Sequence, residues 1–225
     1  MTDETTTGSK ARLYDAFAVS GKALASGKRL ELLDLLAQGE RTVDALARAA
    51  GLQLTTASAH LQILKQAGFV ATRREGVRIH YRLAGDDVAR LFALLRKVAE
   101  RHQVAVPAAR DDYLGADGTG EMSREELRAL VPSGEVVVLD VRPPEEYLAG
   151  HIPGARSIPV GELIDRIDEL PEESEIVVYC RGEYCVLAHD AVRLLAERGR
   201  RAIRLADGML EWRLADLPVE SGQPV

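Results

Sequence analysis

Residues 42–68 read TVDALARAAGLQLTTASAHLQILKQAG, and this stretch decides the fold of the first half of the chain. Thr42 is a good N-cap for a short helix that ends near Ala50. Gly51 provides the turn into a second helix, which Gly68 ends. Two short helices joined by a tight glycine turn form a helix-turn-helix.

Further helices and a hairpin flank this unit. Apolar spacing predicts helices over residues 11–25 and 28–37 before it. After it, the period changes to that of a strand, with Glu75-Gly76 as the turn of a β-hairpin, or wing. The side chains expected on the buried face of the wing are Val77, Ile79, Tyr81 and Leu83. A last amphipathic helix, from residue 86 to about 101, carries one apolar stripe formed by Val88, Leu91, Leu95 and Val98.

The second helix of the helix-turn-helix is expected to face inward through Leu54, Ala57, Leu61 and Leu64. Polar side chains on its outer face are suited to base edges in the major groove, and wing arginines to phosphates. The candidate DNA-binding residues are Gln53, Thr55, Thr56, Ser58, His60, Gln62 and Lys65 on the helix, and Arg73, Arg74 and Arg78 on the wing. A solvated helix face beside a basic hairpin would give the same pattern.

The two halves of the chain carry opposite charge. Residues 1–110 contain 17 Lys and Arg against 11 Asp and Glu, whereas residues 111–225 contain 12 against 24. This asymmetry predicts that one module meets a polyanion and the other does not. The chain has no run of roughly 18 apolar residues, and its first residues are polar and acidic, unlike a signal peptide. We therefore expect a cytoplasmic protein with no membrane partner.

The second half has the pattern of an α/β domain. Periodicity fails over residues 103–121, which predicts a linker. Beyond it, the expected elements alternate: a capped helix opening at residues 123–126, strands at 136–141 and 176–179, a helix at 186–198, a strand at 202–205 and a helix at 209–215. Such alternation predicts a parallel sheet. The predicted domains are residues 1–103 and 122–225, with 104–121 as the linker.

Cys180 stands between a buried strand and a helix. In that position, inward-turned backbone N–H groups and the helix N-terminus stabilise a thiolate, so we expect a lowered pKa and a nucleophilic sulfur. The candidate catalytic residues are Cys180 and the loop that follows it, Arg181, Gly182, Glu183, Tyr184 and Cys185. A cysteine phosphatase needs an arginine six positions after the nucleophile, where this chain has Val186. The alternative is a buried structural cysteine.

Over residues 10–103 the sequence resembles the ArsR/SmtB family of winged helix-turn-helix repressors, most clearly in KRLELLDLLAQGERTVDALARAAGLQLTTASAHLQILKQAGFVATRREGVRIHYRL, residues 28–83. The resemblance implies a homodimer, with the first and last helices at the interface, bound to a double-stranded operator with an inverted repeat. The segment matching the family's cysteine-bearing metal-sensing helix, residues 41–48, has no cysteine. The last helix also lacks the spacing of the family's zinc ligands, so no metal site is expected here.

Residues 122–222 resemble rhodaneses, through LDVRPPEEYLAGHIPGARSIPVGEL at 139–163, VVYCRGEYC at 177–185 and DGMLEWRLADLPV at 207–219. The resemblance implies that Cys180 accepts a sulfur atom and carries it as a persulfide, cradled by the amides of residues 181–185. The residues expected to brace the loop are Asp140, Arg142 and His151. A small sulfur donor or a thiol is the implied partner, and no cofactor is expected. Arg181 is suited to attract an anionic donor such as thiosulfate, an attraction that Glu183 opposes.

Two questions stay open at this level. Cys185 either accepts sulfur or closes a bridge with Cys180, or it only fills space beneath the loop. The second question is the function, for which three hypotheses remain. The chain is a transcriptional regulator, expected to be a repressor, that senses or handles reactive sulfur or oxidants through Cys180. Alternatively, it is a sulfurtransferase tethered to DNA, or a regulator with an inert rhodanese scaffold. The intact cysteine argues against the inert scaffold, and fusion to a DNA-binding module favours the sensor. One way for the state of Cys180 to change DNA affinity is through the acidic second half, which would lie near the basic face and compete with DNA, or be held away from it.

Overall fold

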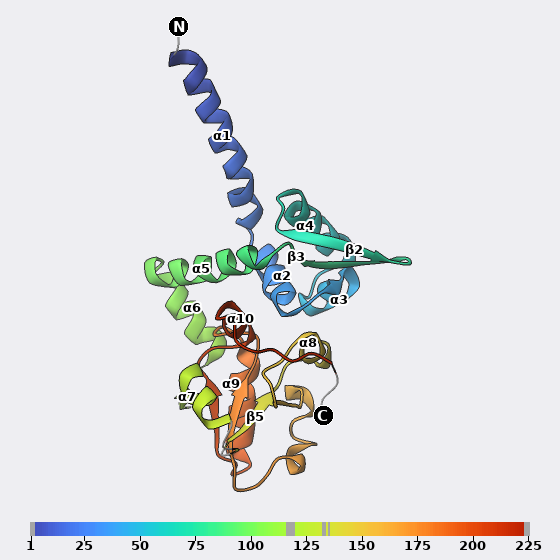
Figure 1. Cartoon of the computed structure of the whole chain (residues 1–225), viewed down its shortest axis with the longest axis vertical. Helices are drawn as coiled ribbons and strands as arrows, with labels where there is room; N and C mark the ends of the chain where they lie inside the picture. Colours follow the sequence, from blue (N-terminus) through green and yellow to red (C-terminus); the bar gives the residue numbers. More distant parts are fainter. Residues whose placement is uncertain (1–2, 116–119, 132–133, 135, 223–225) are drawn as a thin grey trace. The chain divides into compact units, whose positions relative to one another are not determined.

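The computed structural model describes residues 3–115, 120–131, 134 and 136–222 (Figure 1). Contacts between residues divide it into two compact units, residues 1–92 and 93–225. The division falls inside helix α5 (Asp86–His102), so this one helix contributes residues to both units. None of the helices in the described part of the chain is long and apolar enough to cross a membrane.

Unit 1 contains the predicted helix-turn-helix and wing. Its helices are α1 (Asp3–Leu24), α2 (Gly27–Gln38), α3 (Val43–Ala49) and α4 (Leu54–Gln66). Its described strands, β1 (Arg41–Thr42), β2 (Val70–Glu75) and β3 (Arg78–Leu83), form an antiparallel sheet in the order β1-β3-β2. The Thr42 side chain accepts a hydrogen bond from the Ala45 amide at 3.3 Å, which confirms it as the cap of α3. Gly51 and Gly68 have φ of 61° and 79°, conformations that favour glycine.

Three expectations about buried side chains in unit 1 are wrong. Leu54 is 49% exposed, since it stands at the first turn of α4, before the helix packs on its neighbours. On the wing, Val77 is 95% and Ile79 43% exposed, whereas Tyr81 is buried. The wing tip extends beyond the helices that would cover it, so strand alternation there does not correspond to burial. The remaining inward positions, Ala57, Leu61 and Leu64, are buried as predicted.

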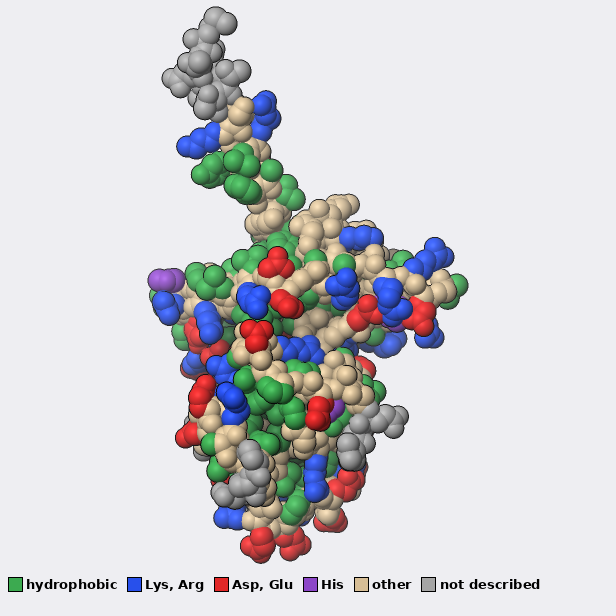
Figure 2. Space-filling view, viewed as in Figure 1, with side chains coloured by type: hydrophobic (Ala, Val, Ile, Leu, Met, Phe, Trp, Pro, Cys, Tyr) green, Lys and Arg blue, Asp and Glu red, His purple; other side chains and the backbone are tan. Residues whose placement is uncertain are grey.

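Apolar side chains remain exposed on the first and last helices of the winged-helix region. Figure 2 shows hydrophobic side chains gathered on α1, where Leu13, Tyr14 and Phe17 are each more than half exposed. The predicted stripe of α5 divides: Val88 is buried, whereas Leu91 and Val98 are exposed. Both helices therefore present apolar surface that the described residues of this chain leave uncovered.

The segment predicted as a linker contains a helix, α6 (Ala105–Leu114). The expectation of irregular structure there is wrong for these residues. Pro107 lies in the first turn of α6, where a proline removes no intrahelical hydrogen bond and is tolerated. Leu114, near the end of α6, is buried, so the helix docks instead of remaining a solvated connection.

Unit 2 is built on a parallel sheet. In the described residues the strand order is β4 (Glu121–Met122), β8 (Ala202–Leu205), β7 (Glu175–Tyr179), β5 (Val136–Asp140) and β6 (Arg156–Ser157). One face packs on α9 (Val186–Glu197) and on the 3-10 segments Val160–Glu162 and Ile167–Glu169. The other face packs on α7 (Arg124–Leu130), α8 (Pro144–Ala149) and α10 (Met209–Leu214). The predicted α/β fold and the capping box of α7 at Ser123 are confirmed.

Strand alternation at the end of β7 separates two neighbouring side chains. Successive residues of a strand point to opposite faces of the sheet. Val178 and Cys180 therefore belong to the core beneath α9, whereas Val177 and Tyr179 belong to the core beneath α7, α8 and α10. The sulfur of Cys180 and the hydroxyl of Tyr179 consequently meet different surroundings.

Candidate functional site

Cys180 directly follows β7 and is 3% exposed. Five residues later, Cys185 is the N-cap of α9 and is also buried. Both are free thiols. The Cys180 thiol lies 3.3 Å from the carbonyl oxygen of Cys185 and 3.8 Å from that of Gly182, so in the structure it acts as a hydrogen-bond donor. The loop is therefore closed around the sulfur.

The expected lowering of the Cys180 pKa is wrong for this closed loop. Burial raises the pKa of Cys180 well above its usual value, although backbone hydrogen bonds from Gly182 and Ala188 act in the opposite direction. The Cys185 amide donates to the Gly182 carbonyl at 3.0 Å, so the predicted amide cradle is incomplete. The N–H groups that do reach the sulfur lower its pKa by less than the loss of hydration raises it.

The two thiols form a hydrogen-bonded pair. This bond lowers the pKa of Cys185, against the effect of burial, and the positive charge of Arg181 lowers it further. A thiolate on one member of such a pair is stabilised by the S–H of the other.

The Cys180 loop rests on the backbone that begins α10. The amide of Met209 donates to the Cys180 carbonyl and that of Leu210 to the Arg181 carbonyl, each at 3.0 Å. This approach requires glycine at position 208, because a Cβ on Gly208 would lie 2.3 Å from the Gly182 nitrogen. One on Gly182 would lie 2.9 Å from a Glu211 oxygen. The DGM sequence at 207–209 thus fixes the floor of the loop.

Arg181 is held by a buried carboxylate. Its guanidinium makes hydrogen bonds of 2.7–3.0 Å to both oxygens of Glu146, which is 1% exposed. Beside it, burial and the negative charge of Glu100 raise the pKa of Glu183. The arginine expected to attract an anionic donor is therefore engaged in holding the loop to α8.

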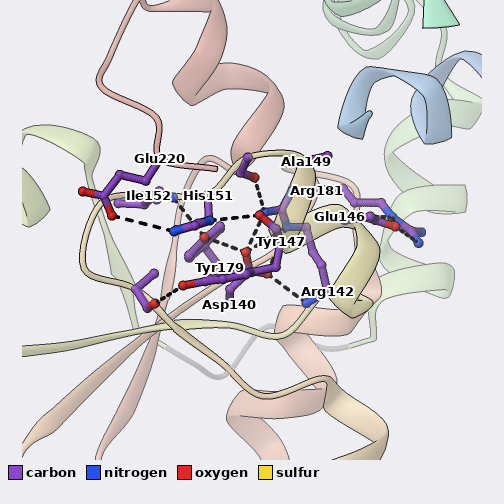
Figure 3. A network of polar contacts seen from close by, with 12 residues as sticks. Asp140, Arg142, Glu146, Tyr147, Ala149, His151, Ile152, Tyr179, Arg181 and Glu220 are labelled. Atoms are coloured by element: carbon purple, nitrogen blue, oxygen red, sulfur yellow. Dashed lines mark hydrogen bonds and ion pairs between the residues drawn. The ribbon is translucent and has the colours of Figure 1, made fainter. Parts of the chain in front are cut away.

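A buried polar network on the other face of the sheet braces the end of β7 (Figure 3). Asp140 forms an ion pair with Arg142 at 2.6 Å, and both side chains are fully buried. The same carboxylate accepts a 2.6 Å hydrogen bond from the hydroxyl of Tyr179, the residue before Cys180. His151 stacks on Tyr147, with ring centroids 3.7 Å apart. The structure therefore brings all three expected bracing residues into one region, with Asp140 and Arg142 bound most directly to the strand of Cys180.

The polar candidates on α4 lie mostly on its exposed side. Gln53, Thr55, Thr56, Gln62 and Lys65 are exposed, whereas Ser58 and His60 are half-buried. Gln62 also donates to the hydroxyl of Tyr81 at 3.1 Å, which connects α4 to the wing.

The three wing arginines differ in their surroundings. Arg73 pairs with Glu40 at 2.7 Å and with Glu75 at 2.8 Å. Arg74 donates to the Gly76 carbonyl at 3.0 Å, and Arg78 is exposed. Competition with two carboxylates makes Arg73 the weakest of the three candidates for a phosphate contact.

Family models match both regions. The model for the bacterial regulatory protein, arsR family, matches residues 26–72, and that for the rhodanese-like domain matches residues 123–215. The HTH-type transcriptional regulator Rv0324 of Mycobacterium tuberculosis is 58% identical over 216 residues, a match that covers 96% of this chain and 95% of that protein. This chain belongs to the ArsR family of bacterial regulatory proteins. It is a transcriptional regulator with a winged helix-turn-helix and a rhodanese-like domain, which confirms the fold and the family resemblance expected from sequence.

Two partial relatives each match one part of this ArsR-family chain. A sulfurtransferase of Allochromatium vinosum is 30% identical over 101 residues, 44% of this chain and 92% of that protein. The solution structure of the homodimeric winged helix-turn-helix DNA-binding domain of Mycobacterium bovis Mb0332 is 57% identical. That match covers 47% of this chain and 93% of the other, with a TM-score of 0.41.

Sequence reasoning missed several residues that hold the cysteine loop of this ArsR-family regulator. They are Glu146 on α8, Tyr179 on β7, Glu211 on α10, and Arg96 and Glu100 on α5. Glu146 carried no usable signal, because it follows Glu145 in the first turn of a short helix, where acidic residues are ordinarily solvent-facing. The two α5 residues carried none, since charges on an amphipathic helix are ordinarily solvent-facing. Within the described residues, no group of three or more His, Cys, Asp or Glu is arranged to hold a metal ion.

Proposed function

We propose that this regulator senses reactive sulfur through Cys180 and converts the state of that cysteine into a change of operator affinity. The observation that carries the proposal is the pair of buried thiols at the end of β7, where the Cys180 sulfur lies 3.3 Å from the carbonyl oxygen of Cys185, in a chain of the ArsR family. A solitary structural cysteine would not require a second thiol, a glycine at the floor of the loop and a carboxylate-held arginine around it. In this proposal residues 1–103 bind DNA, residues 122–225 handle sulfur, and the protein acts in the cytoplasm.

The chemistry begins with an inorganic polysulfide or a low-molecular-weight persulfide. Opening of the loop lets the Cys180 thiol lose its proton to solvent, and the resulting thiolate attacks the outer, sulfane sulfur of the donor. The donor's S–S bond breaks, and Cys180 becomes a persulfide while the donor leaves as a thiolate or a shorter polysulfide. The Cys185 thiolate then attacks the inner sulfur of that persulfide and expels hydrosulfide. Two thiols are thereby oxidised to a disulfide, and the sulfane sulfur is reduced by two electrons to sulfide.

The DNA partner we propose is a double-stranded operator with an inverted repeat, bound by a homodimer. The exposed apolar side chains of α1 and α5 support the dimer, because a single chain leaves them uncovered. Two recognition helices related by a two-fold axis require half-sites about one helical turn apart, or a multiple of it. A footprint with one asymmetric half-site would contradict this arrangement.

A sulfurtransferase activity is the second candidate, and the loop itself is the observation in its favour. The pairing of Arg181 with Glu146 and the presence of Glu183 argue against an efficient reaction with thiosulfate, a dianion. Turnover with thiosulfate and an acceptor thiol separates the candidates. Rapid turnover favours the enzyme, whereas a reaction that stops after one equivalent of donor per chain favours the sensor.

Operator binding before and after polysulfide treatment tests the proposal. We expect the affinity of the wild type to change on treatment, and that of Cys180→Ser to stay constant. Mass spectrometry of the same samples establishes whether Cys180 carries an added sulfur atom or is bridged to Cys185. Modification of Cys180 without any change in operator affinity would refute the sensor function.

A further inference from the structure

The last turns of α5 contact the loop that follows Cys180. The Tyr184 hydroxyl donates to Glu100 at 2.6 Å, and the same carboxylate pairs with Arg110 of α6 at 2.6 Å. These residues all belong to unit 2, which begins at Ala93. A loop residue four positions after the reactive cysteine is thus bound to a helix that begins in unit 1.

Arg96, one turn earlier on α5, makes two contacts at the same place. Its guanidinium carbon lies 4.8 Å from the centroid of the Tyr184 ring, and it pairs with Glu211 at 2.7 Å. The two side chains of that pair are only 17% and 9% exposed, so solvent screens the interaction weakly. The other Glu211 oxygen accepts from the Gly208 amide at 3.1 Å, directly beneath Gly182. Arg96 therefore touches both the outer residue and the floor of the cysteine loop.

Reaction at Cys180 requires this loop to move. The sulfur is 3% exposed, and two carbonyl oxygens of the loop lie within 4 Å of it. A second sulfur atom bonded to Cys180 would need space that the closed loop does not leave on that side. The contacts of Tyr184 and Glu211 with α5 are among those that keep the loop closed.

We propose that Arg96 and Glu100 latch the cysteine loop, and that sulfur chemistry at Cys180 releases the end of α5 from it. This inference rests on the proposed sensing function and names the residues that carry the signal out of the sulfur site. The signal enters a helix whose earlier residues Val88 and Phe92 are buried in unit 1. The helix also presents the exposed apolar side chains that we assign to the dimer interface.

Thermodynamic linkage makes the latch measurable in both directions. If modification of Cys180 changes operator affinity through α5, operator binding must change the ease of modifying Cys180 by the same factor at equilibrium. In the wild type, saturating operator DNA should therefore change the extent of modification of Cys180 at a fixed donor concentration. If the latch carries this coupling, the change should shrink in variants that remove the α5 contacts.

The test uses Tyr184→Phe, which removes one hydroxyl, and Arg96→Gln, which removes the charge. Tyr113→Phe and Arg101→Gln are matched controls at exposed positions. The rate of Cys180 alkylation by iodoacetamide, followed by mass spectrometry, should rise about tenfold in the first two variants, because a hydrogen bond to a charged acceptor is lost or weakened. The controls should react at the wild-type rate, and Arg96→Lys should restore part of the protection.

Operator titrations with and without polysulfide complete the test. We expect the ratio of the two affinities to shrink toward one in Tyr184→Phe and Arg96→Gln, while Cys180 is still modified. If the wild type responds and both variants respond equally and alkylate no faster, the latch is refuted and the sensing function stands. If wild-type Cys180 is modified without any change in affinity, the sensing function itself fails. The fluorescence of Trp212, the chain's one tryptophan, verifies that each variant has folded.

Discussion

Replacing Asp140 by asparagine should destabilise unit 2 and loosen the strand that carries Cys180. The carboxylate accepts four groups: the amide, Nε and terminal nitrogen of Arg142, and the hydroxyl of Tyr179, at 2.6–3.0 Å for the shortest contact of each. Asparagine keeps the shape and one acceptor oxygen, but its NH₂ group must then face donors. It also leaves the Arg142 charge, fully buried, with the Gly150 carbonyl as a remaining partner at 2.8 Å.

The expected loss follows from that uncompensated charge. Removing one partner of a buried ion pair costs about 3–5 kcal/mol, far more than the pair contributes over an apolar replacement. In a unit of this size such a loss lowers the melting temperature by about 10 °C or more. Because Tyr179 precedes Cys180, the same substitution should also speed alkylation of Cys180.

Urea unfolding followed by Trp212 fluorescence measures the effect. Trp212 is buried on the same face of the sheet as Tyr179, so its emission reports on unit 2 and not on unit 1. Arg166→Gln is the matched control, since it removes a charge from exposed ion pairs of the same unit and should shift the midpoint little. A loss below about 1 kcal/mol for Asp140→Asn would refute the assignment of this network as the brace of the loop.

Three further outcomes follow from the structure. In operator titrations at several salt concentrations, Arg78→Ala should reduce the salt slope by about one unit, whereas Arg73→Ala should reduce it less, because its guanidinium already binds two carboxylates. Cys185→Ser should leave polysulfide-treated protein with a terminal persulfide on Cys180 and a weaker operator response, and mass spectrometry should find no intramolecular bridge. Because burial raises the pKa of Cys180, its alkylation rate should keep rising above pH of about 8.5, and a plateau below that pH would contradict the closed loop.

The sequence predicted most elements because their signals are local. The Thr42 cap, the glycine turns and the alternation of apolar runs with helices each depend on a few neighbouring residues, and all appear in the structure. The wing shows the limit of such patterns. The alternation of apolar and polar residues correctly predicted a strand through Ile79. Whether the Ile79 side chain is buried depends on a second element that covers that face of the strand, and no described element covers the tip of the wing.

The cysteine site depended on contacts between distant residues, which local patterns do not contain. The position of Cys180 directly after a strand identified the cysteine and its loop. The pKa of Cys180, however, depends on its burial by segments from other parts of the chain. The role of Arg181 was predicted from its charge alone, whereas in the structure its guanidinium binds Glu146, 35 positions earlier in the chain. The α5 residues lie 84 and 115 positions from their partners Tyr184 and Glu211. No spacing rule within one helix or loop predicts such pairs.

The strength of the α5 contacts sets the size of the response that they can transmit. A hydrogen bond to a charged acceptor contributes about 1.5–3 kcal/mol, and an arginine over an aromatic ring about 0.5–1 kcal/mol. Together these reach or exceed the 1–3 kcal/mol typical of allosteric coupling, and each 1.4 kcal/mol is about tenfold in affinity. Persulfidation, by contrast, changes the charge of the acidic half by at most about one unit, and salt screens that change within about 8 Å. The contacts between the cysteine loop and α5 can therefore change the free energy of DNA binding more than a change in the net charge of the second half can.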